Sequence, residues 1–539
     1  MIHWADHLAI VPILLPLLAG AVMMALDDTW RTFKAGLGIV STLGLLGVAI
    51  ALMVGADAGT TIVYRLGNWP ATFGIVLVAD RLSAMMLVLT ALLGFAALLF
   101  SLARWHRTGA HFHPLVQFQL MGLNGAFLTG DLFNLFVFFE VLLAASYGLA
   151  LHGSGIARVR AGLHYIAINL AASLLFLVGV SLMYGVAGTL NMADLAARIP
   201  AITGQNRALL EAGAAILGVA FLTKAAMWPL GFWLPGTYAA ASAPAAAIFS
   251  MLSKVGVYAV LRLWLLLFGP DSGVSAGLGG DWLLAGGIAT IAFGAISVLA
   301  TQDLVRLAGA SVLISSGTLL AAIGAGKIGV TSGALYYLAS SVLAIGAFFL
   351  LVELLERGHE VGADVLAVTL EAFGDADEED PEPGEEVGVA IPATMAILGF
   401  SFLACALLLA GLPPLSGFVA KFAILSALVG AGVPVDSPVS LAGWALLTML
   451  ILSGLATLIS MARAGIRTLW APLDGRVPRV RVIEMAPVLL LIVACIGLTA
   501  QAGPAMRYMQ ATAKALYAPQ DYVRGVLAPP PPTPRKGGA

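Results

Sequence analysis

The sequence predicts an all-α polytopic membrane protein with about fourteen transmembrane helices. Of its 539 residues, 60% are hydrophobic and only 10% are charged, and the mean hydropathy is +0.98. Soluble domains carry about 25% charged residues. The second observation is a series of apolar runs of about 20 residues, the length that spans a bilayer as a helix. The third is that prolines and glycines interrupt two of these runs, which no straight helix tolerates.

Charge and cysteine content exclude several classes of function. The net charge of −2 argues against nucleic acid as a partner. Cys405 and Cys495 lie in apolar runs, where we expect them to pack as small hydrophobic side chains. The sequence contains no CxxC motif, haem motif or metal-ligand cluster, so it suggests neither a cofactor nor a metal. These features favour a transport protein that is not itself an enzyme.

The expected helices follow the apolar runs in chain order. They cover residues 7–26, 33–54, 80–103, 112–130, 131–151, 160–186, 208–235, 242–268, 281–300, 304–325, 331–356, 391–431, 439–463 and 485–505. No lysine or arginine precedes the first run, so it is not a cleavable signal peptide. Lysine and arginine are concentrated in alternate loops, which predicts that the N-terminus lies outside.

Two of the predicted helices are broken, which indicates an internal repeat. The breaks lie at Pro229 and Pro235 in one helix and at Pro413 and Pro414 in the other. A local alignment of residues 221–226 with residues 418–423 places a lysine near each break. Broken helices at corresponding positions are typical of inverted-repeat transporters. We therefore expect two inverted five-helix repeats formed by helices 4–8 and 9–13.

The remaining segments complete the expected organisation. Helices 1–3 lie within residues 1–111, the two repeats cover 112–268 and 281–463, and the last helix covers 485–505. Residues 191–200 are short and amphipathic, which predicts a helix at the membrane interface. Residues 371–386 form an acidic loop, either simply solvated or used for docking or ion attraction. The Pro-rich tail, residues 506–539, is expected to be disordered.

Four ionisable residues lie inside apolar helices, where a charge is costly and usually marks an ion route. Glu140 lies near the middle of the fifth helix, and Lys224 immediately precedes the first break. Removal from water favours a neutral lysine, whereas a nearby carboxylate favours the charged form, so a Glu–Lys pair has two states. Lys254 is the expected onward site for a proton, and Lys421 is the expected exit. The alternative is a purely structural ion pair.

Other polar residues could line the route. His164 lies in the sixth helix and is either a proton carrier or a hydrogen-bonded structural residue. Ser340 and Ser341 lie in the eleventh helix. Their hydroxyls either hold water in a polar channel or bond to the backbone of their own helix.

Five motifs carry a resemblance to a known family. They are GDLFNLFVFFE with Glu140, TKAAMWPLGFWLPGTYAAASAP with Lys224, SMLSKVGVYAVLR with Lys254, ATQDLVRLAGASVLISSGTLLAAIG, and AGLPPLSGFVAKFAIL with Lys421. Over most of helices 4–13 the chain resembles the proton-conducting antiporter-like subunits of respiratory complex I, membrane-bound hydrogenases and the multisubunit Mrp-type Na⁺/H⁺ antiporter. Within that family it is most similar to the D-type subunits of the Mrp antiporter.

The resemblance implies roles and partners. In the family, these four positions carry the half-channel Glu–Lys pair, the central lysine and the exit residue. The implied partners are the A-, B-, C-, E-, F- and G-type subunits, the lipid bilayer, H⁺ and Na⁺. The alternative is a proton-pumping subunit of a complex I-type enzyme or a hydrogenase. The family usually has a histidine in helix 11, where this chain has Ser340 and Ser341, so water and hydroxyls would have to serve there.

Overall fold

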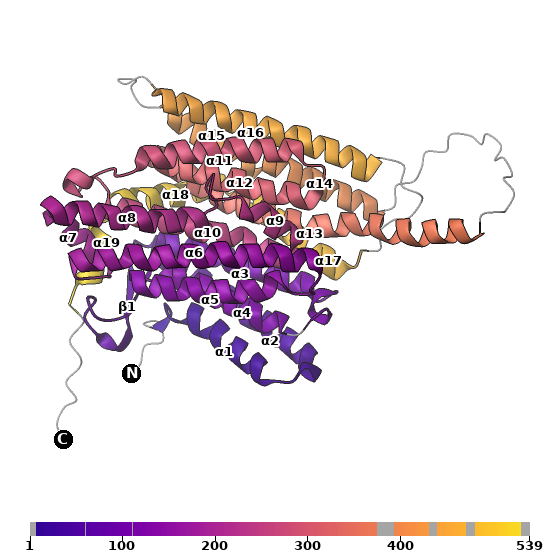
Figure 1. Cartoon of the computed structure of the whole chain (residues 1–539), viewed down its shortest axis with the longest axis horizontal. Coiled ribbons are helices and arrows are strands. Elements are labelled where there is room, and N and C mark those ends of the chain that lie inside the picture. The colour runs from indigo at the N-terminus through magenta and orange to yellow at the C-terminus, as the bar shows by residue number, and fades with distance from the viewer. Residues whose placement is uncertain are drawn as a thin grey trace.

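The computed structural model describes residues 7–59, 61–109, 111–373, 393–430, 439–470 and 480–529. They form a bundle of long helices with a single two-stranded sheet at one end (Figure 1). In this described part, 12 helices are long and apolar enough to cross a membrane, and two shorter apolar helices accompany them. The predicted fold class, a polytopic helical membrane protein, is confirmed.

The elements fall into four groups along the chain. The N-terminal group contains α1 (Val11–Ala25), α2 (Arg31–Asp57), β1 (Ile62–Arg65), β2 (Val76–Ala79) and α3 (Arg81–Ser101). The next contains α4 (Phe112–Leu128), α5 (Leu132–Ala150), α6 (Ile156–Ala187), α7 (Met192–Arg198), α8 (Gly204–Lys224), α9 (Trp233–Ala240) and α10 (Ala243–Leu267). The third contains α11 (Gly280–Ala300), α12 (Leu304–Gly324), α13 (Ile328–Phe373), α14 (Ala393–Ala410), α15 (Ser416–Val429) and α16 (Leu441–Gly465). The chain ends with α17 (Val482–Ala500), α18 (Ala502–Tyr517) and α19 (Gln520–Leu527).

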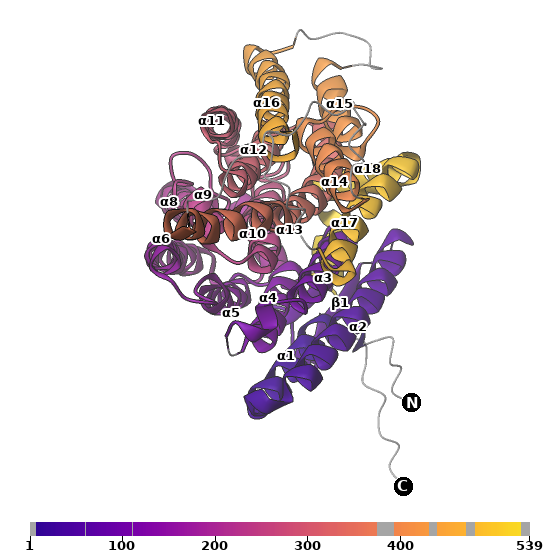
Figure 2. The ribbon, with the colours of Figure 1, turned by 90° about the vertical axis from the view of Figure 1, so that its right-hand side faces the viewer.

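The helix α10 lies at the centre of the bundle (Figure 2). It packs against α3, α8, α12 and α13, and all of its residues except Ala243 and Trp264 are buried. A helix that is apolar on every side is stable only when protein or lipid surrounds it completely. Any charged residue on α10 therefore depends on partners from the neighbouring helices.

The first predicted break divides residues 208–235 into α8 and α9, which ends at Ala240. After Lys224 the chain turns at Ala226, which has a φ of 59°. Pro229 follows, and it has no N–H to continue a helix. A Cβ atom at Gly231 would lie 2.2 Å from the carbonyl oxygen of Ala226, so only glycine permits this approach.

The second break, between α14 and α15, repeats these backbone features. Gly411 has a φ of 76°, and a Cβ atom at Gly417 would lie 2.0 Å from the carbonyl oxygen of Leu408. The match pairs Ala226 with Gly411 and Gly231 with Gly417.

This match corrects the predicted repeat alignment. Lys224 ends the helix before the first break, whereas Lys421 lies on the helix after the second. The predicted alignment of residues 221–226 with 418–423 is therefore wrong. It matched similar side chains, although the turn at each break is determined by backbone conformation. The inverted relation of the two five-helix units stays a prediction.

Most helix bounds agree with the predicted ranges to within a few residues, and α13 is the main exception. It continues to Phe373, well beyond the predicted end at residue 356. Hydropathy falls after Leu355, but residues with good helix propensity follow, and apolar length does not mark a helix end. The predicted acidic loop at 371–386 lies outside the described residues apart from its first three.

The structure corrects the prediction that residues 506–539 are disordered. Residues up to Tyr517 belong to α18, and α19 follows at Gln520–Leu527. Met509, Ala513 and Leu516 recur at helical spacing and are buried, so α18 has an apolar face that packs on the bundle. Only the residues from Pro529 onward are Pro-rich, so this composition does not extend to α18 or α19, and residues from 530 onward lie outside the described part.

A small sheet and the C-terminal helix α19 close the same end of the bundle (Figure 1). The strands β1 and β2 pair antiparallel from Ile62 opposite Ala79 to Arg65 opposite Val76. The guanidinium of Arg65 donates to the carbonyl oxygens of Gly525, Val526 and Ala528, at 3.2, 3.0 and 2.8 Å. These bonds join the sheet to the C-terminal helix α19 and the residue that follows it.

The end of the bundle also contains the predicted short helix at 191–200. It is present as α7, and the side chain of Asn191 accepts hydrogen bonds from the N–H groups of Ala193 and Asp194. This is the usual role of asparagine at a helix N-terminus. The predicted location of this helix at the membrane interface stays a prediction.

Candidate functional site

Glu140 lies near the middle of α5, on the side that faces α6. Its Oε1 atom accepts a hydrogen bond of 2.5 Å from the hydroxyl of Ser173 on α6. Phe139, Phe176 and Phe221 contact one another beside this pair, with ring centroids 5.3–6.0 Å apart. The carboxylate is thus anchored at the edge of an aromatic cluster.

Lys224 is the last residue of α8, and its side chain points into the same aromatic cluster. The residue is only 5% exposed, and its Nζ atom has no hydrogen-bond partner within the described residues. Nζ lies 5.1 Å from the centre of the Phe139 ring, which is within the range of a cation–π contact. The structure describes both Glu140 and Lys224, and their charged atoms do not come within the 4 Å that defines an ion pair. In this conformation the two side chains are therefore not in direct contact, and the predicted two-state behaviour stays a prediction.

Lys254 lies in the middle of the central helix α10 and is fully buried. Its Nζ atom donates a hydrogen bond of 3.1 Å to the hydroxyl of Ser316 on α12. An ammonium group has three donors, so one hydroxyl satisfies it only partly. Gly256 packs directly on the end of α8, where an added Cβ atom would lie 2.5 Å from the backbone nitrogen of Ala225. The backbone segments that carry Lys254 and Lys224 are thus in close contact.

Lys421 lies on α15, just after the second break. Its Nζ atom donates to the carbonyl oxygen of Ala410 at 2.8 Å and to that of Leu409 at 3.5 Å. These carbonyls end α14, where the helix dipole favours a positive charge. The side chain therefore reaches back across the break and caps the preceding helix. Lys421 and Lys224 are held in different ways, which agrees with their different positions relative to the breaks.

Serine hydroxyls lie between Lys254 and Lys421. Ser315, next to Ser316, donates a hydrogen bond of 2.9 Å to Ser341, and Ser341 donates to the carbonyl oxygen of Leu338. The hydroxyls of Ser340 and Ser416 lie 2.8 Å apart. Ser341 thus bonds both to the backbone of its own helix and to a serine on a neighbouring helix, and the expected role in holding water stays a prediction.

A small cavity adjoins both predicted serines. Its volume is about 10 Å³, close to the space that one water molecule requires. Besides Ser340 and Ser341, its lining includes Leu409, whose carbonyl accepts from Lys421, and Gly417 at the start of α15. A water molecule here would connect the serines with the Lys421 end of the route.

Replacing both Ser340 and Ser341 by alanine should slow proton transfer by about tenfold or less, because a water in the cavity would lose hydroxyl partners while no proton store is lost. The pH optimum should not move, since a serine hydroxyl does not titrate near neutral pH. Initial exchange rates in membrane vesicles between pH 6 and pH 9 measure both quantities. Ser426→Ala, at a hydroxyl that bonds only within α15, is the control. Wild-type rates in the double variant would show that the route avoids these residues.

His164 lies apart from the four charged residues. It is exposed on α6, and its ring meets Phe232 edge-on with centroids 5.5 Å apart. Both residues line an open cleft of about 1090 Å³ between α6, α9, α11 and α12, with Arg160 and Arg306 also in its wall. The structure does not place His164 in contact with the Glu140 or Lys224 side chains.

The sequence did not identify the hydroxyl partners of the charged residues. Ser173, Ser316 and Ser416 all contact predicted site residues, and each lies on a different helix from its partner. Serine is common in membrane helices, where it permits close packing, so its presence alone gives no signal. Cys405 and Cys495 are buried and free, as predicted.

A polytopic bundle with two broken helices is typical of membrane transport proteins. Residues 129–374 match the family described as "NADH:quinone oxidoreductase/Mrp antiporter, TM". The fold is also similar to a chain of the Mrp complex from Dietzia sp. DQ12-45-1b, with a TM-score of 0.82 and 25% identity over 97% of this chain and 99% of that one.

Two curated relatives indicate the type of subunit within this family. The D-type subunit of a probable K⁺/H⁺ antiporter of Rhizobium meliloti is 61% identical over 98% of this chain and 99% of its own. The D-type subunit of a Na⁺/H⁺ antiporter of Alkalihalophilus pseudofirmus is 34% identical over 97% and 99%. The chain belongs to the family of D-type subunits of multisubunit Mrp-type cation/H⁺ antiporters. It is a transporter subunit and not an enzyme, as predicted.

Proposed function

We propose that this chain translocates protons for a monovalent cation/H⁺ antiporter in the bacterial plasma membrane. Protons move along Glu140, Lys224, Lys254 and Lys421. The N-terminus lies outside, and the A-, B-, C-, E-, F- and G-type subunits complete the complex. The observation that carries the proposal is the set of three buried lysines, of which Lys224 has no hydrogen-bond partner in the described structure. Such groups are too costly for an inert scaffold.

The first step uses Glu140 and Lys224 as a two-state element. When the carboxylate approaches the amine, the lysine holds a proton; when they separate, desolvation favours release. In the present conformation Ser173 holds the carboxylate, while Lys224 lies against the Phe139 ring. This conformation corresponds to the separated state, in which a proton passes on toward Lys254.

The second step carries the proton from the central lysine to the exit. Lys254 donates to Ser316, and the neighbouring Ser315 bonds to Ser341. Water in the adjoining cavity bridges these hydroxyls to Lys421. Lysines store the proton and hydroxyls order the water, because hydroxyls both donate and accept hydrogen bonds.

The exchanged cation is K⁺ or Na⁺. The resemblance of the motifs favours Na⁺, whereas the name of the Rhizobium meliloti relative contains K⁺. Both relatives are antiporter subunits matched along nearly their whole length, which supports an antiporter over the membrane arm of a redox enzyme. The proposed route is the same for either cation, since only protons use these four residues.

Everted vesicles that contain the complete complex test this function. In cells without other antiporters, respiration acidifies the vesicle interior, and addition of KCl or NaCl should then dissipate the pH gradient. Lys254→Ala should reduce this cation-dependent recovery to the background rate, because no other residue on α10 replaces the proton carrier. A dye that reports the pH gradient gives the rate.

The control for this experiment is Lys514→Ala, which removes an exposed lysine on α18. It should exchange like the wild type. Blue-native electrophoresis shows whether each complex is assembled. Normal exchange by an assembled Lys254→Ala complex would contradict the proposed route.

A further inference from the structure

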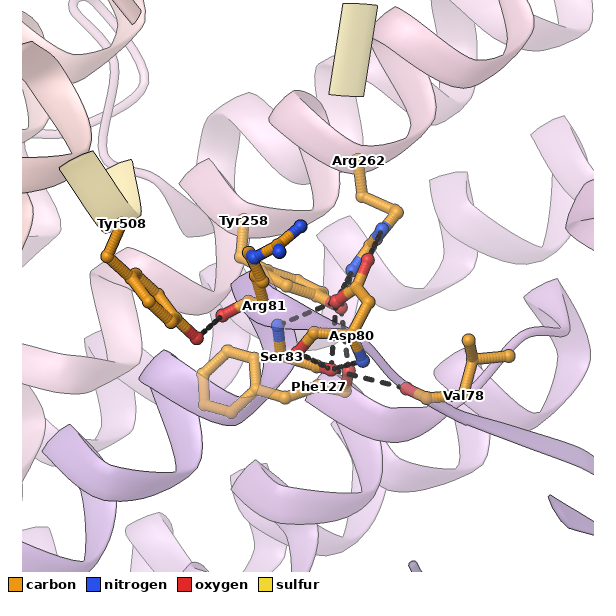
Figure 3. A network of polar contacts seen from close by, with 8 residues as sticks. All are labelled: Val78, Asp80, Arg81, Ser83, Phe127, Tyr258, Arg262 and Tyr508. Carbon is orange, nitrogen blue, oxygen red and sulfur yellow. Dashed lines mark hydrogen bonds and ion pairs between the residues drawn. The ribbon is translucent and has the colours of Figure 1, made fainter. Parts of the chain in front are cut away.

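An ion pair between α10 and the start of α3 lies close to the central lysine. The two terminal nitrogens of Arg262 donate to the two carboxylate oxygens of Asp80, at 2.5 and 2.8 Å (Figure 3). The side chains are only 7% and 20% exposed. This bidentate geometry is characteristic of arginine, which remains charged under all physiological conditions.

Asp80 is fixed in place by the start of α3. Its carboxylate accepts hydrogen bonds from both the backbone N–H and the hydroxyl of Ser83. Burial alone raises the pKa of Asp80, but the charge of Arg262 and these hydrogen bonds lower the pKa further, so it lies below its usual value. The pair therefore stays charged at neutral pH.

Tyr258 occupies the position between the ion pair and Lys254. Lys254, Tyr258 and Arg262 are spaced four residues apart and share one face of α10. The Tyr258 hydroxyl donates a hydrogen bond of 2.6 Å to the carbonyl oxygen of Phe127 and accepts one of 3.3 Å from Arg262 (Figure 3). Its hydrogen is thus committed to the backbone. The rise of a helix places Arg262 about 12 Å from Lys254 along the axis.

Beyond Arg262 the bundle contains a cavity of about 80 Å³, called here the Arg262 cavity. Its lining includes Asp80, Arg262, Thr512, Asp521 and Tyr522. The side chain of Asp521 is 89% exposed, so the lining extends from the buried ion pair to the surface. The volume is enough for several water molecules, and the charged groups give them partners.

We propose that the Arg262 guanidinium is an electrostatic plug that stops protons from passing between Lys254 and the water of the Arg262 cavity. A guanidinium keeps its proton under physiological conditions, so it does not relay protons, and its charge disfavours a proton or hydrated cation beside it. The plug forces a proton on Lys254 to continue toward Lys421, and it thereby protects the coupling of the exchange. This inference depends on the proposed role of Lys254 as a proton carrier.

The geometry explains why the plug is paired. An unpaired guanidinium at this depth would be costly, and Asp80 makes its burial tolerable. Both oxygens of the Asp80 carboxylate accept hydrogen bonds from Arg262, and one of them also accepts from Ser83. The carboxylate is therefore already paired and is a poor acceptor for a proton from Lys254.

Proton leakage through the purified complex tests the plug. Proteoliposomes in choline buffers, without K⁺ or Na⁺, receive an acid jump, and an enclosed dye reports the decay of the pH gradient. Arg262→Gln should accelerate this decay by about tenfold or more, because the repulsive charge is lost. The double variant Asp80→Asn/Arg262→Gln removes both charges, which avoids an unpaired carboxylate, and it should leak as well.

Two further variants separate the charge from the structural role of Arg262. Arg262→Lys keeps the charge but loses the bidentate geometry, so its proton leak rate should be as low as that of the wild type. Arg81→Gln changes a neighbouring arginine in the wall of the same cavity, which pairs with the exposed Asp57 instead of Asp80, and this variant should not leak. Leakage caused by Arg262→Lys or Arg81→Gln would indicate general loosening and overturn the plug.

Adding Lys254→Ala to the double variant identifies the route. Loss of the leak would support a path through Lys254. A leak that persists would overturn the plug, because protons would then cross elsewhere; the proposed function would still be judged separately, by the cation-dependent exchange of the single Lys254→Ala variant. An assembled double variant that does not leak would also overturn the plug.

Discussion

Lys224→Ala is expected to abolish cation-dependent proton exchange while the complex stays assembled. The amine lies at the end of α8, buried and without a hydrogen-bond partner in the described structure, so its removal costs few stabilising contacts. Alanine cannot hold a proton, and no neighbouring group is positioned to replace the amine. Recovery of the pH gradient in everted vesicles after addition of KCl or NaCl should fall to the background rate.

A lysine outside the route provides the comparison. Lys327 is exposed and donates a 3.4 Å hydrogen bond to the carbonyl oxygen of Leu428. Lys327→Ala should exchange at nearly the wild-type rate, with the same amount of complex in the membrane. If Lys224→Ala assembled and exchanged normally, Lys224 would not be a proton carrier.

Glu140→Gln should reduce exchange by at least about a hundredfold, the lower end of what a positioned proton carrier contributes. Glutamine has almost the same shape and can still accept from Ser173, so the packing of α5 against α6 is retained. It has no negative charge to favour the charged form of Lys224. Initial exchange rates over a range of pH and cation concentration measure the effect.

Glu140→Asp should be milder, because the charge remains although the carboxylate is one methylene farther from Ser173. Glu211→Gln is the matched control, since it removes a carboxylate on α8 that bonds to Arg207 and Ser275 instead. Activity of Glu140→Gln equal to that of the wild type would mean that the carboxylate has only a structural role.

The sequence predicted the helices and the charged residues because both depend on strong local signals. A run of apolar residues predicts a span, and a lysine within such a run, such as Lys254, is unusual enough to indicate function. The two broken helices were predictable from Pro229 and Pro414 for the same reason. The fold class and the four candidate site residues therefore required no tertiary information.

Contacts between distant segments could not be predicted in this way. The alignment that paired Lys224 with Lys421 was wrong, because the repeated feature is a backbone turn with a positive φ at Ala226 and Gly411. The partnership of Lys254 with Ser316 depends on how α10 packs against α12. Helix α18 was missed because its buried face is short and lies next to a Pro-rich end.

The contacts of Arg65 with residues near the C-terminus also have a consequence for synthesis. Translation proceeds at about 5–20 residues per second, so the ribosome needs on the order of ten seconds or more to advance from Arg262 to Tyr522. During that time α10 is already made, but the segments that complete the wall of its cavity are not. The end of the bundle that carries the sheet and α19 is therefore closed last, and a ribosome that stops before α19 leaves this end incomplete.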